Sequence, residues 1–232
     1  MADPVQATTE GAKAIGEVAK TAGKVVDAAR DMGGFIAKYT HGTLEQAMGI
    51  VHDKIAYARW ERQYRLMDRA SAFLSARGVK HPPTGIPLKL AVPLLQAATL
   101  EDDDYVQDMW AQLLVNSSIE PNPQNRAFIS MLENMTPLDA LVLNELARAE
   151  GTPYTPMLTY ELPERAHPVL DLKSVEPLTD PSEDVAFSLS NLARISAITP
   201  AATWDGGITV AQVKLTMLGR QLVRACSGTV AE

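Results

Sequence analysis

Apolar side chains near the start of the chain follow a helical repeat, recurring at alternating spacings of three and four residues. Small residues at the same spacing lie beside them and would let another helix approach closely: Ala12, Gly16, Ala19 and Gly23. Each glycine costs a helix about 1 kcal/mol, so this helix needs cover from other protein to persist. We predict a helix over residues 12–36 whose narrow apolar seam is Ile15, Val18, Ala22, Val25, Ala29, Met32 and Ile36.

The helical pattern continues through the middle of the chain. A proline-rich break at residues 81–87 separates one long helix from several shorter ones. We place Trp60 and Trp110 in the helical core, because each lies among apolar residues at helical spacing. We expect Thr99 to cap the acidic start of the helix that carries Trp110. The predicted helices span residues 43–76, 88–98 (a buried helix despite Pro93), 105–115, 128–132 and 138–149.

The last third of the chain differs from the rest in composition and in predicted secondary structure. Residues 151–181 contain six prolines and are predicted to be mostly an irregular insertion. A helix over residues 185–195, two strand-like runs joined by Asp205-Gly206-Gly207 and a final helix after Thr216 follow. This order is typical of a winged-helix module. We therefore expect a mainly α fold: an amphipathic Gly/Ala-rich helix in residues 1–41, a helical body in 42–135 and a winged-helix-like domain with a small β-hairpin in 136–232.

Composition sets the class of protein. The chain has 232 residues, 46% of them hydrophobic and 21% charged, with a formal charge of −7, so any contact with nucleic acid must be local. One cysteine, Cys226, excludes a disulfide framework and suits a reducing compartment. No leader peptide or spanning window is evident, so we expect a cytoplasmic protein. No catalytic, cofactor or metal motif appears, and we expect no enzyme activity and no cofactor.

Charge is concentrated in one basic band and one acidic run. Four arginines lie on one side of the long helix, at spacings of three, three and four: Arg59, Arg62, Arg65 and Arg69. The stripe has two interpretations, an external site for phosphate or lipid headgroups, and internal pairing with the acids of residues 101–104. Internal pairing is favoured because the rest of the molecule is acidic. We predict an ion pair from this stripe to Asp102, Asp103 or Asp104.

The predicted recognition helix offers two candidate DNA-contacting residues, Asn191 and Arg194. Residues 136–232 hold twelve acids against seven bases, and phosphate contacts dominate DNA affinity. The charge therefore favours a structural or protein-binding module over a DNA-binding one.

Residues 87–116 (PLKLAVPLLQAATLEDDDYVQDMWAQLLVN) carry a family resemblance, with support from residues 44–46, 57–63, 132–143 and 215–220. This run is similar to the signature of the Abi-alpha family, a bacterial family associated with abortive infection. The resemblance implies phage defence rather than a reaction, and it brings no catalytic residues. It also suggests that the acidic run and the arginine stripe are paired features of the family.

These observations favour a non-enzymatic defence effector or accessory protein that acts through helix-mediated association. Its partner would be another protein or a second copy of the chain. A membrane surface, with peripheral attachment at the inner membrane, stays open, although residues 1–38 carry no net positive charge to attract anionic lipid. The alternative from another class is a winged-helix DNA-binding regulator. A metal-dependent nuclease is disfavoured, because adjacent helical aspartates point about 100° apart.

Overall fold

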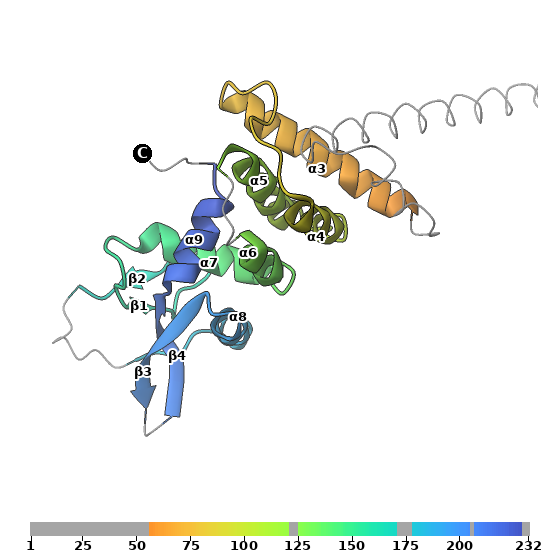
Figure 1. Cartoon of the computed structure of the whole chain (residues 1–232). Coiled ribbons are helices and arrows are strands. Elements are labelled where there is room, and N and C mark those ends of the chain that lie inside the picture. The colour runs from red at the N-terminus through yellow and green to blue at the C-terminus, as the bar shows by residue number, and fades with distance from the viewer. Residues whose placement is uncertain (1–55, 121–124, 171–177, 205–206, 229–232) are drawn as a thin grey trace, which may run out of the picture.

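The computed structural model describes residues 56–120, 125–170, 178–204 and 207–228 (Figure 1). The predicted seam in residues 12–36 lies outside this part of the chain, as do the side chains of Arg59 and Trp60. The described residues form a mainly helical protein with a small antiparallel sheet of four short strands.

Seven helices are present in the described residues, and their order matches the predicted succession. They are α3 (Ala56–Ala76), α4 (Leu88–Ala98), α5 (Asp104–Ile119), α6 (Asn125–Leu132), α7 (Pro137–Ala149), α8 (Glu183–Arg194) and α9 (Met217–Ala225).

Helix α5 lies at the centre of the helical body. Eleven of its sixteen residues are buried. Helices α3, α4, α6, α7 and α9 all contact it. Trp110 is fully buried within this core, which confirms the predicted location of this side chain.

Helix α4 is covered on one side. Its inner side consists of Ala91, Leu94, Ala97 and Ala98, all buried. The expectation of a buried helix holds for this inner side only, because Leu88 and Val92 on the outer side remain 44% and 41% exposed.

The start of α5 differs from the sequence-based expectation. Thr99 ends α4, and its hydroxyl donates to the carbonyl of Gln96 (2.9 Å) instead of capping α5. Asp103 is the N-cap, and its Oδ1 accepts from the backbone N–H groups of Tyr105 and Val106 (both 3.0 Å). A capping side chain must directly precede the first helical turn, and Thr99 lies too far ahead of it.

Helix α7 begins as its sequence predicts. Thr136 and Asp139 form a capping box with Pro137 between them, at the position where a missing N–H costs nothing. Because both partners lie within one turn, this start depends only on local sequence.

The four strands form one sheet in the order β2-β1-β4-β3. The predicted hairpin is present as β3 (Ile198–Trp204) paired with β4 (Gly207–Leu215). Two short strands from the proline-rich span, β1 (Met157–Leu158) and β2 (His167–Pro168), extend this sheet on the β4 side. Sequence analysis missed both, because two residues are too few to show an alternating pattern.

Candidate functional site

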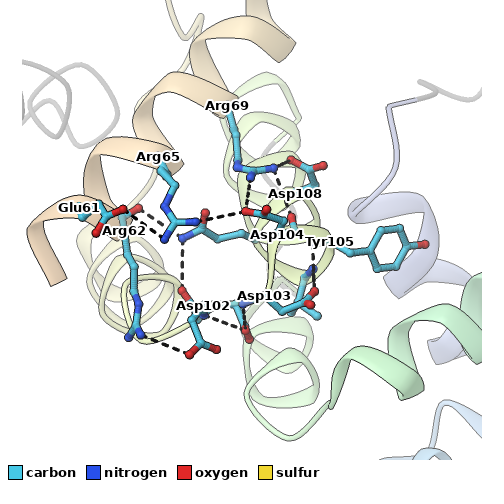
Figure 2. A network of polar contacts seen from close by, with 12 residues as sticks. Glu61, Arg62, Arg65, Arg69, Asp102, Asp103, Asp104, Tyr105 and Asp108 are labelled. Atoms are coloured by element: carbon cyan, nitrogen blue, oxygen red, sulfur yellow. Dashed lines mark hydrogen bonds and ion pairs between the residues drawn. The ribbon is translucent and has the colours of Figure 1, made fainter. Parts of the chain in front are cut away.

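Three arginines of the stripe, Arg62, Arg65 and Arg69, face the start of α5 (Figure 2). Arg62 Nη2 lies 3.4 Å from Asp102 Oδ2, and Arg65 Nη1 lies 3.2 Å from Asp104 Oδ1. Arg69 bridges two acids, with Nη2 at 2.6 Å from Asp104 Oδ1 and Nη1 paired with Asp108. The predicted ion pairs between the stripe and the acidic run are therefore present.

The acids of the run have different structural roles. Asp102 and Asp104 pair with the arginines, whereas Asp103 caps α5. Glu101 Oε1 accepts from the backbone N–H groups of Asp102 and Asp103, at 3.0 and 2.9 Å. The run thus closes the turn between α4 and α5, starts α5 and attaches α3 to it.

The charge balance of this network disfavours an external anion. Three arginines face four carboxylates, from Glu61, Asp102, Asp104 and Asp108. The side chains of Asp102 and Asp104 are 76% and 73% exposed, so they line the solvent side of the network. An incoming phosphate would meet carboxylates before it met a guanidinium group.

The network holds α3 parallel to α5 and close to the end of α4. Arg62 Nη1 donates to the carbonyl of Leu100 (3.1 Å), which follows the C-cap residue of α4, Thr99. The pairs advance together along both helices, from Arg65 with Asp104 to Arg69 with Asp108. Each exposed pair contributes only about 0–1 kcal/mol, so the network sets the geometry more than the stability.

The two candidate DNA-contacting residues lie at the junction of α8 with α7. Asn191 Nδ2 donates to the carbonyl of Asn134 (2.8 Å) and to Asp139 Oδ2 (2.7 Å). Arg194 donates through Nε and Nη2 to Asn191 Oδ1 (3.0 and 2.8 Å). The structure therefore brings them together, and Asn191 Nδ2 and the Nε and Nη2 groups of Arg194 donate within the chain.

Two polar clusters were not predicted from the sequence. Arg220 on α9 pairs with Glu150 after α7 (Nε to Oε2, 2.6 Å), and its guanidinium lies over the ring of Tyr154. Hydrogen bonding to Glu150 raises the pKa of Arg220, and burial opposes this shift. No local pattern identifies partners seventy positions apart.

The second unpredicted cluster surrounds Arg77, directly after α3. Its guanidinium pairs with Asn116, donates to Gln112 Oε1 (2.9 Å) and reaches the carbonyls of Ser227 and Gly228 (3.4 and 3.3 Å). Burial lowers the pKa of Arg77 from its ordinary value. The cation lies at the carbonyl end of α9, where the helix dipole favours positive charge.

None of these clusters is arranged as a metal site. Across the residues that the structure describes, His, Cys, Asp and Glu side chains nowhere gather in threes at metal-binding distance. The same described residues include no helix with the length and apolar character needed to cross a membrane.

Comparison with protein families identifies the family of this chain. The family model described as abortive infection alpha matches residues 61–226. The chain belongs to the abortive infection alpha family. The matched region includes the arginine and aspartate network, Arg77 with its side-chain partners Gln112 and Asn116, and the sheet, so these are contained in the abortive infection alpha domain. No curated protein and no solved structure matched the chain.

Proposed function

We propose that this protein acts in bacterial defence against phage by abortive infection. It is a non-enzymatic effector or accessory protein, located in the cytoplasm, and it works through helix-mediated association with another protein or with a second copy of itself. Membership of the abortive infection alpha family carries this proposal. Peripheral attachment to the inner membrane is the other form of association that it allows.

The pairing of polar groups supports a role in association rather than in catalysis. Arg62, Arg65 and Arg69 of the stripe are neutralised by neighbouring acids. Burial raises the pKa of the Cys226 thiol, which keeps this thiol un-ionised and weakly nucleophilic. By contrast, Phe187 on the outer side of α8 is 76% exposed. An aromatic side chain presented to solvent is a common anchor in protein interfaces.

The test of this proposal is a phage challenge. A bacterial host carrying the gene is infected at low and at high multiplicity, with the same host lacking the gene as reference. Abortive infection predicts fewer phage progeny and survival of the culture at low multiplicity only. Protection at both multiplicities, or at neither, would contradict it.

Two pairs of substitutions in the N-terminal segment test whether the predicted helix of residues 12–36 mediates the association. Val18→Asp with Val25→Asp places carboxylates in the predicted seam and is expected to abolish protection, because burial of an unpaired carboxylate is unfavourable. Lys20→Asp with Lys24→Asp changes charge on the opposite side and serves as the control. The proposal is supported if the control pair keeps protection and the seam pair loses it. Equal protection with the two pairs of substitutions counts against it. Fractionation of the same cells distinguishes a cytoplasmic from a membrane-attached protein.

A winged-helix DNA-binding regulator is the second candidate. The order of α7, α8, the β3–β4 hairpin and α9, with α8 packed on α7 and on the hairpin, favours it. Against it stand the internal hydrogen bonds of Asn191 and Arg194 and the acidic charge of this region. Binding to duplex DNA, measured across a range of salt, separates the two candidates: a regulator shows affinity that falls steeply with salt, and an association protein shows none.

A further inference from the structure

A hollow of about 360 Å³ lies between the first turn of α5, one side of α7 and the loop that joins β1 to β2. Helix α7 contributes Leu141, Asn144 and Arg148, which share one side of the helix because they are spaced three and four residues apart. Tyr105 of α5 and Pro163 of the loop form the other walls. We call this hollow the α5–α7 pocket.

The α5–α7 pocket has apolar walls that the rest of the described chain leaves partly open. Leu141 and Tyr105 are 45% and 38% exposed, although their neighbours Val142 and Val106 are fully buried. Tyr105 projects from α5 on the side away from the arginines (Figure 2). Pro163 of the loop is half-buried. These side chains give the pocket a surface that suits an aliphatic chain.

Hydrogen bonds fix the loop that closes one side of the pocket. Glu145 Oε1 accepts from the backbone N–H of Ala166 (3.1 Å). Arg148 donates to both oxygens of Glu145, through Nε at 2.8 Å and Nη2 at 2.9 Å. Leu162 of the same loop is buried in the core. The pocket is therefore formed without a ligand, and the charges of Glu145 and Arg148 compensate each other.

The remaining polar groups of the pocket are acceptors. In the described part of the chain, no donor contacts the carboxylate of Glu164, the side-chain oxygen of Asn144 or the hydroxyl oxygen of Tyr105. Glu164 thus supplies an uncompensated negative charge. Burial raises the pKa of Tyr105, and the negative charge of Asp108 adds to this shift. The potential in the pocket is therefore negative and favours a cation over an anion.

A lysine side chain matches these features. Its stem is apolar and its ammonium group carries three donors and no acceptor, whereas the pocket offers apolar walls and three free acceptors. An arginine head group carries five donors, more than these groups accept. Ligand pockets have volumes of about 300–1,000 Å³, so a pocket at the lower end of this range suits one side chain better than a whole helix.

We infer that the α5–α7 pocket binds a lysine side chain of a partner protein, with the stem of this lysine against Leu141 and Pro163. Its ammonium group is held by Glu164, with Asn144 and the Tyr105 hydroxyl as further acceptors. This inference rests on the proposed association with another protein, and it adds the chemistry by which the partner is recognised.

Binding of a capped tripeptide, Gly-Lys-Gly, to the full chain tests this inference. The titration is followed by NMR at the backbone amide of Ala166 and the ring of Tyr105. A single bound side chain is expected to give a saturable shift with a dissociation constant on the order of 10 mM. Gly-norleucine-Gly keeps the stem without the charge, and Gly-Glu-Gly reverses the charge. Both control peptides should bind about fivefold more weakly, or less.

Glu164→Gln is the variant that isolates the charge of the pocket. It should weaken the binding of Gly-Lys-Gly about fivefold, because it removes the uncompensated negative charge and changes little else at an exposed position. Glu183→Gln is the matched control, since Glu183 is an exposed acid on α8 and does not line the pocket. Its affinity for Gly-Lys-Gly should equal that of wild type.

Three results would overturn the inference. They are the absence of a saturable shift with Gly-Lys-Gly up to about 100 mM, equal binding of Gly-norleucine-Gly, and equal affinity of Glu164→Gln and wild type. Tighter binding of pentylamine than of Gly-Lys-Gly would assign the pocket to a free amine instead of a protein. Lysine binding without phage protection would contradict the proposed function alone, and phage protection without lysine binding would contradict this inference alone.

Discussion

At the scale of single residues, Gly219 shows how closely two elements approach. It lies in the first turns of α9, where the helix passes the backbone just before β3. A Cβ atom at this position would lie 2.0 Å from the carbonyl oxygen of Ala197. Thr216 joins the same contact, because its hydroxyl donates to the carbonyl of Ser196 (2.6 Å) and accepts from the N–H of Gly219 (2.9 Å).

Gly219→Ala is expected to destabilise the protein by about 1–3 kcal/mol, despite the better helix propensity of alanine. The added methyl group meets backbone, which cannot move aside as a side chain would. Urea unfolding of both proteins measures this loss. Gly151→Ala is the matched control and should be nearly neutral, since nothing lies within 4 Å of its added Cβ. Equal effects of the two substitutions would contradict this account.

Cys226 provides a second prediction at this scale. Burial raises the pKa of its thiol, so the native thiol stays protonated and should resist Ellman's reagent until the protein unfolds. The unfolded thiol ionises above about pH 8.5, which favours the unfolded state there. The contribution of Cys226 to stability is therefore complete below that pH and declines above it, by up to about 1.4 kcal/mol per pH unit.

Unfolding midpoints in urea at pH 7.5 and 9.5, compared with those of Cys226→Ala, isolate this effect from other titrating groups. The wild-type protein should lose more stability between the two pH values than the variant does. Rapid labelling of the native thiol would show that Cys226 is accessible. The same conclusion would follow if wild type and Cys226→Ala lost equal stability between the two pH values.

At the scale of secondary-structure elements, α3 and α5 are joined by two kinds of contact. Leu66, Ala70 and Leu74 pack in the apolar core, and the arginine stripe forms exposed ion pairs along the edge. Burial of apolar surface supplies most of the free energy that holds α3 against α5, since exposed ion pairs contribute little to stability. The ion pairs select one register between the two helices.

A double-mutant cycle on Arg69 and Asp108 should give a coupling energy of about 0.5–1 kcal/mol at low salt, decreasing in 1 M salt. Trp110→Ala, which empties the core beside this edge, should cost about 3–5 kcal/mol regardless of salt. Urea unfolding at low salt and in 1 M salt measures the coupling energy and the cost of Trp110→Ala. A coupling that persists in 1 M salt would mean that the pair is shielded from solvent.

At the scale of the whole molecule, Arg77 connects the two ends of the described chain. It follows α3 directly, yet it reaches the carbonyls of Ser227 and Gly228, about 150 positions later. Asn116 reinforces the link by donating from Nδ2 to the carbonyls of Ala225 and Ser227 (2.8 and 3.1 Å). The helical body and the C-terminal region are therefore joined through α9, as Figure 1 shows in the position of α9 between α5 and the sheet.

Arg77→Ala is expected to cost about 1–3 kcal/mol, because it leaves the side-chain oxygens of Asn116 and Gln112 without their donor. Hydrogen exchange at residues 224–228 should also accelerate. Arg126→Ala is a suitable control, since Arg126 is exposed and its removal leaves no buried partner among the contacts seen in the described residues. Equal losses of stability in both variants would indicate that Arg77 does not join the two regions.

Within the described residues, the amino-acid sequence by itself determined the helices, their order, the β3–β4 hairpin and the pairing of the arginine stripe with the acidic run. Each of these depends on signals within a few turns: apolar spacing, a capping box at Thr136 and Asp139, or glycines between two strands. The stripe and the run were matched through charge alone, because the stripe is a basic band in an otherwise acidic molecule. The family was also evident from the contiguous residues 87–116.

Only the tertiary structure decided which distant groups meet. Strands β1 and β2 exist because β4 offers an edge to pair with, and nothing in their own two residues requires a strand. Arg220 pairs with Glu150, and Arg77 donates to the carbonyl of Ser227 at the end of α9, across separations that no local sequence pattern encodes. The burial of α4 is likewise decided by packing: the sequence shows that the helix is rich in apolar residues, but which of its sides the other described helices cover depends on where α3, α5 and α6 lie.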